Sequence, residues 1–252
     1  FNHAIVAAKN DDGSYLLMDC TDESTKDLLP NYLCNCSYLV AHPQGEDLQT
    51  ASIVPARENL VHVETTGEID SLGTLTAETR MKFDGINDNA YRSYFARIKP
   101  EQRRQFFEGV LKASIATAVL TDFDVRPADI QDTTEALSIR VRFTATDLLI
   151  GSGDTVLMPV PQVGARVGLV NFIIGQTGLQ KRRFPLQTNY ACGVQEKLSL
   201  RADSAIGSFA SVPEFAPIDD PTISWSRKFV HQAGSLEGQS EFLIKVVELD
   251  PQ

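Results

Sequence analysis

The sequence predicts an α+β fold built mainly from antiparallel β-sheet, with a β-sandwich-like C-terminal domain that carries one or two helices. In most segments apolar and polar residues alternate, which is the period of a half-buried strand. One segment, 99–115, has helical spacing instead, and an Asn-Asp-Asp-Gly turn at 10–13 joins two short strand-like runs. Helices that cover one face of an antiparallel sheet fit this pattern.

The clearest strands lie in the middle of the chain. Between 74 and 83, Leu75, Met81 and Phe83 occupy alternate positions with Thr76 and Lys82 between them. The segment 137–144 alternates in the same way, and several strands are bounded by Gly, Pro or Asp. Strands are expected at 1–8, 15–22, 60–64, 74–83, 118–125, 137–144, 167–174, 196–201, 222–229 and 241–249.

Two consecutive helices are expected between the strands at 74–83 and 118–125. The second begins at Pro100, because Pro is favoured at the first helical position and Glu101 adds an acid in the first turn. Phe107 and Val110 then recur on one face, together with Phe106, Leu111 and Ile115. A shorter helix is expected just before it, at about 89–98.

These elements suggest three regions. A hairpin region covers 1–51, an α+β sub-region covers 52–161, and the remainder, 162–252, is expected to contain strands only. The boundary near Pro161 rests on a Pro- and Gly-rich stretch, which predicts a loop.

Composition excludes several classes of protein. The 252 residues hold 23 Lys and Arg against 33 Asp and Glu, so the net charge is −10, which argues against binding to a nucleic-acid backbone. With 42% apolar and 22% charged residues the chain lies in the globular range. No window reaches the roughly 18 apolar residues of a membrane span. Neither a membrane span nor a nucleic-acid partner is therefore expected.

The four cysteines predict neither a disulfide scaffold nor a metal site. Cys34 and Cys36 are separated by one residue and cannot bridge comfortably. Together with Cys20 they lack the paired spacings of zinc sites, and Cys192 is far away in the sequence. We expect no metal and no cofactor.

The hairpin is the one place where residues suggest chemistry, because it brings His3 to the acidic end of the second strand. A two-residue Asp-Gly turn sets His3 opposite Asp22, whereas a five-residue loop over 9–13 sets it opposite Asp19. A His oriented by a carboxylate is the base half of a Cys-His-Asp arrangement, since the acid fixes the imidazole tautomer and stabilises the imidazolium.

The order of short motifs here resembles the end of the transglutaminase-like core, in which a His strand is followed by a strand ending in Asp-Pro-Thr. The motifs are Asn2-His3, then Asp19-Cys20-Thr21-Asp22, Leu29-Pro30 and Tyr38-Leu39-Val40. The later part is similar to the C-terminal domain of unknown function that follows this core in large bacterial proteins. The motifs there are Gly73, Gly85, Ala90-Tyr91-Arg92, Arg183-Phe184-Pro185-Leu186 and the strand at 242–249. Cys20 stands where the family has Pro, which leaves Asp19 and Thr21 in place.

The resemblance implies that His3 is the general base and Asp19 its orienting acid. In this family the nucleophilic Cys precedes the His, and only two residues precede His3 here. The chain is therefore expected to be a C-terminal piece of a longer protein, inert alone, whose native partner is the missing N-terminal part. The uncovered hairpin would otherwise dock on the following domain or exchange with a second copy. By resemblance alone, the protein is exported to the periplasm or the cell exterior.

Two functions follow from this interpretation. In the first, the parent protein is a thiol enzyme acting on acyl groups, as a peptidase, amidase or transglutaminase, and this chain supplies the His-Asp half of its site. In the alternative, the core is a scaffold, and the β-rich C-terminal domain is a non-catalytic binding or assembly module at the bacterial cell envelope.

Overall fold

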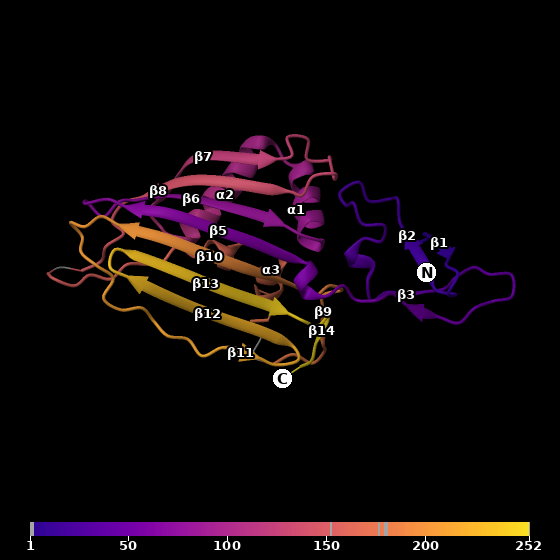
Figure 1. Ribbon diagram of the computed structural model, residues 1–252. Helices are drawn as coiled ribbons and strands as arrows, with labels where there is room; N and C mark the ends of the chain where they lie inside the picture. The colour runs from indigo at the N-terminus through magenta and orange to yellow at the C-terminus, as the bar shows by residue number, and fades with distance from the viewer. Residues whose placement is uncertain (1–2, 152, 176, 179–180, 252) are drawn as a thin grey trace.

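The computed structural model describes residues 3–151, 153–175, 177–178 and 181–251. Its body is an eight-stranded sheet with the strand order β11-β12-β13-β10-β5-β6-β8-β7 (Figure 1). The strands are β5 (Leu60–Ile69), β6 (Leu75–Phe83), β7 (Ala118–Arg126), β8 (Ser138–Ala145), β10 (Cys192–Ala202), β11 (Ile218–Asp219), β12 (Ile223–Gln232) and β13 (Ser235–Ile244). Strands from both sides of the Pro- and Gly-rich stretch near Pro161 share this sheet.

The sheet is mostly antiparallel, as predicted, but it is mixed, because β5 and β10 pair in parallel at its centre. The predicted alternation is confirmed in β6, where Leu75, Met81 and Phe83 are buried and Thr76 and Lys82 are exposed. The buried face of the sheet joins one hydrophobic core, and the polar side chains between face outward.

The expected β-sandwich is not confirmed. Three helices on one face bury the apolar side of the sheet, and the other sheets in the described residues have two strands each (Figure 1). Alternation along a strand shows that one face is covered, but it does not show whether a helix or a second sheet covers it.

The two expected helices are present as α1 (Ile86–Arg97) and α2 (Pro100–Ser114). Helix α2 begins at Pro100, and Phe107 and Val110 are buried against the sheet. Helix α1 begins three residues earlier than predicted, after Gly85, whose φ is +53°. No helix in the described part of the chain is long and apolar enough to cross a membrane.

The predicted strand at 167–174 is wrong, because α3 (Leu169–Gly175) forms there instead. Side chains of α1 accept hydrogen bonds from the backbone where α3 begins. The Leu169 N–H donates to Asn87 Oδ1 at 2.9 Å, and the Gly168 N–H donates to the Tyr91 hydroxyl at 2.8 Å. A short apolar run fits a buried strand and a buried helix equally well, so these contacts decide between them. The expectation that 162–252 holds strands only fails for the same reason.

Residues 3–51, here called the N-terminal module, extend beyond one end of the sheet (Figure 1). The module contains β1 (Val6–Lys9), β2 (Tyr15–Met18), β3 (Ser37–Tyr38) and β4 (Gln49–Thr50), with one 3-10 turn, η1 (Asn31–Leu33). The remaining short elements are η2 (Ala56–Glu58), η3 (Val163–Arg166), β9 (Leu186–Gln187) and β14 (Glu248–Leu249). Strands β9 and β14 pair with each other, so the predicted strand at 241–249 is divided into the end of β13 and β14.

The N-terminal module has almost no hydrophobic core. Between residues 3 and 50, all of which are described, no Val, Leu, Ile, Met or Tyr side chain is buried. Its buried residues include Asp19, Asn31 and Cys34. The module is therefore organised by polar contacts, whereas the body of the protein is organised by apolar packing.

Candidate functional site

The hairpin that carries His3 is present, with a register between the two that the sequence allowed. Lys9 pairs with Tyr15 and Val6 with Met18, so the loop is the five residues Asn10–Ser14. The loop is closed by the Asn10 N–H, which donates to the carbonyl of Ser14 at 2.8 Å. Both predicted pairings of His3 across the hairpin are therefore wrong by register, and His3 lies before the first residue of β1.

His3 and Asp19 nevertheless meet through their side chains. His3 Nε2 lies 2.8 Å from Asp19 Oδ2. Asp19 Oδ1 accepts two further hydrogen bonds from Thr21, at 2.9 Å from the backbone N–H and 2.8 Å from the hydroxyl. The Asp19 side chain is only 1% exposed, whereas that of His3 is 38% exposed. The acid is thus fixed and enclosed, and the imidazole stays accessible.

The hydrogen bonds determine the charge and the tautomer of this pair. Burial raises the pKa of Asp19, but the hydrogen bonds from His3 and Thr21 outweigh burial and place the pKa below its ordinary value of 3.8. An ionised carboxylate can only accept, so Nε2 of His3 must carry the proton of the bond. In the neutral imidazole, Nδ1 is then the free lone pair, which can take a proton from a nucleophile.

Asp22, the other predicted partner of His3, is used elsewhere. Its Oδ2 accepts a hydrogen bond of 2.7 Å from Asn89 Nδ2 on α1, and its Oδ1 accepts one of 2.8 Å from the Ser24 N–H. Asn89 is 6% exposed. Nothing in the sequence indicated this contact, which joins residues 67 positions apart.

None of the four cysteines donates a hydrogen bond to His3 within the described residues. Cys34 and Cys192 are buried, and burial raises the pKa of both thiols, that of Cys192 to about 12. A thiol with a raised pKa is a poor nucleophile at neutral pH. Cys20 and Cys36 are exposed. The described residues also hold no group of three His, Cys, Asp or Glu side chains placed to bind a metal ion.

A second His–carboxylate pair lies on the outer face of the sheet. His62 Nε2 on β5 is 2.8 Å from Asp84 Oδ2, and the His62 side chain is also 38% exposed. Asp84 is more open than Asp19, at 29%, and Lys82 Nζ lies 3.2 Å from its other oxygen. A neighbouring cation competes for the Asp84 carboxylate, so His62 is held less exclusively than His3.

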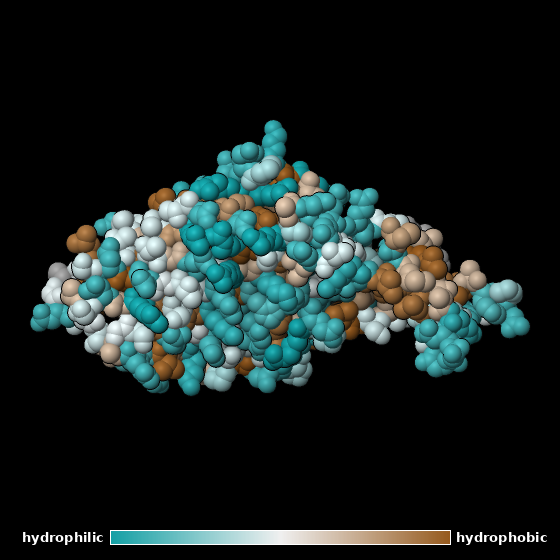
Figure 2. Space-filling view, turned by 45° about the horizontal axis from the view of Figure 1, so that its top comes forward, coloured by the Kyte–Doolittle hydropathy of each residue, from teal (hydrophilic) through white to brown (hydrophobic). Residues whose placement is uncertain are grey.

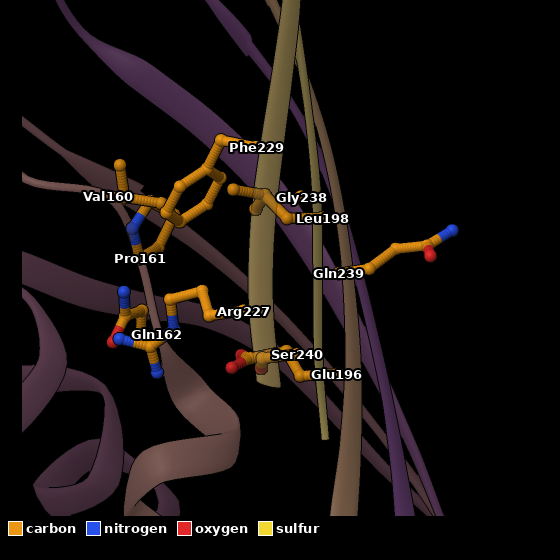
Figure 3. A pocket seen from close by; sticks show the side chains of 10 residues that line it. All are labelled: Val160, Pro161, Gln162, Glu196, Leu198, Arg227, Phe229, Gly238, Gln239 and Ser240. Carbon is orange, nitrogen blue, oxygen red and sulfur yellow. The ribbon is translucent and has the colours of Figure 1, made fainter. Parts of the chain in front are cut away.

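A third polar feature, which the sequence did not reveal, lies at β10, near the centre of the sheet. Glu196 on β10 is 7% exposed and shares a small crevice with Ser240, Arg227 and Gln162 (Figure 3). Its Oε1 accepts a hydrogen bond of 2.8 Å from the Gly164 N–H. Burial raises the pKa of Glu196 to about 7, against the opposing effects of backbone hydrogen bonds and of Arg227. The crevice, about 10 Å³, has room for about one water molecule, so no organic substrate fits there.

Among these three features, the His3–Asp19 pair alone combines an enclosed carboxylate with an accessible imidazole, and it is the best candidate for a functional site. In comparisons with known proteins, no family model, no curated protein and no solved structure matches the chain.

Proposed function

We propose that this chain provides the base and the orienting acid of a Cys-His-Asp acyl-transfer site of the transglutaminase-like kind, and that a partner segment provides the thiol. The observation that carries the proposal is the 2.8 Å bond between His3 Nε2 and an Asp19 side chain that is 1% exposed. The reaction class is that of a peptidase, an amidase or a transglutaminase.

The roles of the two residues follow from the tautomer. Nδ1 of His3 takes the proton of the partner thiol, and the thiolate attacks the acyl carbon of the substrate. The imidazolium, stabilised by Asp19, then gives that proton to the leaving amine as the carbon–nitrogen bond breaks and a thioester remains. Water or a second amine then attacks the thioester carbon while His3 accepts the proton of the incoming group. The carbon–sulfur bond breaks, and the released thiolate takes this proton back from His3.

The surface of the hairpin supports a partner segment. Val6 pairs with Met18 and Ala8 with Leu16, so these four apolar side chains share one face of the two-stranded sheet. Val6 is 57% exposed and Leu16 is 42% exposed. Figure 2 shows brown, apolar side chains gathered on the N-terminal module, at the right of the view. A two-stranded ribbon with an uncovered apolar face is marginally stable, and covering that face is favourable.

In this proposal, by resemblance to transglutaminase-like proteins, the partner is the part of the same gene product that carries the nucleophilic Cys, in an exported bacterial protein. In this proposal the body of the chain, from β5 to β13, is an accessory domain. The chain by itself is inert, because Cys20 and Cys36, its exposed thiols, are not bonded to His3 in the described residues.

Thiol alkylation tests the proposal. The intact gene product and this chain are treated with iodoacetamide between about pH 5 and pH 9. We expect one thiol of the intact protein to react at a pH well below that of an ordinary thiol, and no thiol of this chain to do so. His3→Ala should slow that thiol by at least about a hundredfold. The matched control is His42→Ala, which removes an exposed histidine of the same module and should change nothing.

If the intact protein has no such thiol, or if His3→Ala leaves its reactivity unchanged, the acyl-transfer proposal is wrong. The His3–Asp19 pair is then part of a scaffold, and the alternative function, a non-catalytic binding or assembly module, becomes the one to test.

A further inference from the structure

The turn that carries Asp19 is tied to the body of the protein through Asp22. Asp22 Oδ2 accepts a hydrogen bond of 2.7 Å from Asn89 Nδ2, and Asn89 belongs to the first turn of α1. Asp22 Oδ1 accepts a hydrogen bond of 2.8 Å from the Ser24 N–H. Burial and the nearby Asp22 carboxylate raise the pKa of Tyr32 to about 12, and Tyr32 packs against the main hydrophobic core. Asp22 is therefore anchored from α1 and from within the module at once.

The segment between Asp19 and Asp22 leaves little freedom. The Asp19 N–H donates to the carbonyl of Leu28 at 2.7 Å, which closes the loop that contains Asp22. The Asp19 carboxylate is in turn bound by the N–H and hydroxyl of Thr21, the residue next to Asp22. Movement of Asp22 away from α1 would thus displace Thr21 and rotate the Asp19 carboxylate relative to His3.

The body of the protein holds a second attachment to the module, which fixes the end of the same loop. Asn31 Nδ2 donates to Asn59 Oδ1 at 2.7 Å, and the Ile86 N–H at the start of α1 donates to the same oxygen at 2.9 Å. Asn59 is fully buried. Buried amide networks of this kind are satisfied in only one arrangement, so they fix the position of α1 relative to the module.

We propose that Asn89 is a positioning residue for the His3–Asp19 pair, acting through Asp22. The accessory domain then aligns the base with its acid, in addition to packing beside the module. The inference rests on the proposed function for its catalytic meaning, but the coupling itself can be measured in this chain without a thiol partner.

The experiment is proton and nitrogen NMR of the histidine side chains. A Nε2–H bonded to a carboxylate is protected from exchange with water, and its resonance is visible for that reason. The His62–Asp84 pair is an internal control in the same spectrum, because its bond is also 2.8 Å and the His62 side chain is also 38% exposed. His3→Ala and His62→Ala assign the two resonances.

Asn89→Ala is the principal variant. We expect the exchange of the His3 Nε2–H to accelerate about tenfold or more, while the His62 resonance is unchanged. Asn171→Ala is the matched control, since it removes a part-buried amide on α3 that donates to the carbonyls of Gly164 and Val167 and makes no hydrogen bond to the module within the described residues. It should destabilise the body without affecting His3. The exchanged pair Asp22→Asn with Asn89→Asp keeps one donor facing one acceptor and should restore much of the protection.

Two results would overturn the inference: an unchanged His3 resonance in Asn89→Ala, or an equal loss of the His3 resonance in Asn171→Ala, which would show general destabilisation. Failure of the proposed function is distinguishable from both. If the thiol tests fail while Asn89→Ala still releases the His3 bond, the coupling stands and the acyl-transfer role does not. In an active intact protein, Asn89→Ala should lower kcat more than it changes KM, because it alters the base and leaves the substrate contacts in place.

Discussion

Replacing Glu196 with Gln is expected to stabilise the folded chain at alkaline pH and to change its stability little in mild acid. Glu196 is 7% exposed, at the centre of the sheet, and burial raises its pKa from the ordinary 4.5 to about 7. Above pH 7 the wild-type fold must therefore hold a carboxylate that has little access to water. Gln has nearly the same shape and never ionises, so the variant avoids that cost.

The sign and the size follow from linkage. Between pH 4.5 and about 7 the unfolded chain ionises Glu196 and the folded chain does not, so the free energy of unfolding falls as the pH rises through this window. At about 1.36 kcal/mol for each pKa unit, the full effect is about 3 kcal/mol. The Gly164 N–H, 2.8 Å away, favours the ionised form and is already included in the raised pKa. We expect Glu196→Gln to gain about 1–3 kcal/mol near pH 8 and close to nothing near pH 4.5.

Urea unfolding at a series of pH values measures this difference. The single tryptophan, Trp225 on β12, reports unfolding of the sheet by fluorescence. Glu237→Gln is the control, because Glu237 is an exposed carboxylate on β13 that accepts from the Ser199 hydroxyl at 2.7 Å. If the difference between Glu196→Gln and wild type is the same at acid and alkaline pH, Glu196 is not a buried carboxyl with a raised pKa, and the reasoning fails.

Three further substitutions test the contacts of α1 and the candidate site. Gly85→Ala should lower the free energy of unfolding by more than about 3 kcal/mol, because Gly85 has φ +53° and a Cβ there would overlap Asn59 Oδ1; a urea midpoint close to that of wild type would contradict this. Arg92→Met should lower the free energy of unfolding by about 3–5 kcal/mol, because Arg92 is 1% exposed and donates to three carbonyls of the 127–137 segment. In the variant, the backbone amides of this segment should exchange with solvent before those of the sheet. Asp19→Asn should lower the free energy of unfolding by about 2 kcal/mol at neutral pH. Because the pKa of Asp19 is lowered, the wild type loses this advantage as the pH falls below 3.8, so the two urea midpoints should converge in acid and a constant gap would refute the assignment.

The sequence predicted the strands well where helices cover one face of the sheet and water meets the other. In β6 and β8 the apolar side chains are buried, and outward-facing partners such as Arg80 and Arg140 stand opposite each other. Strands with this environment must alternate, and the pattern is local. What covers the buried face is not a local property, so α1 and α2 were predicted, whereas the expected β-sandwich is not confirmed.

Helix α3 shows where local pattern fails. Its apolar residues, including Val170 and Ile173, are buried and would suit a buried strand equally well. The choice is made by Asn87 and Tyr91, side chains of α1 that bind the backbone at Gly168 and Leu169. Contacts between residues about 80 positions apart leave no periodic signal in the sequence.

The candidate site divides in the same way. The sequence placed His3 near the end of the second strand, because a hairpin brings its ends together, but it left Asp19 and Asp22 open as the partner of His3. The bond between Asp22 and Asn89, and the burial of Glu196, depend on α1 and η3 meeting distant strands. The two candidate partners of His3 were therefore predictable, whereas the choice between them and the residues that support the pair were not.

Hydrogen bonds to the body and apolar burial by the proposed partner both stabilise the arrangement of the site. The N-terminal module buries no large aliphatic or aromatic side chain between residues 3 and 50. Hydrogen bonds of side-chain amides, such as the one between Asn89 and Asp22, attach it to the body. Bonds of this kind contribute about 1 kcal/mol each, so the module should open more easily than the sheet. A segment that covers Val6 and Leu16 would add apolar burial that the module lacks, and by mass action it would stabilise the closed form. The closed form is the one in which Asp19 holds His3, so binding of the thiol-bearing partner and alignment of the base are expected to strengthen each other.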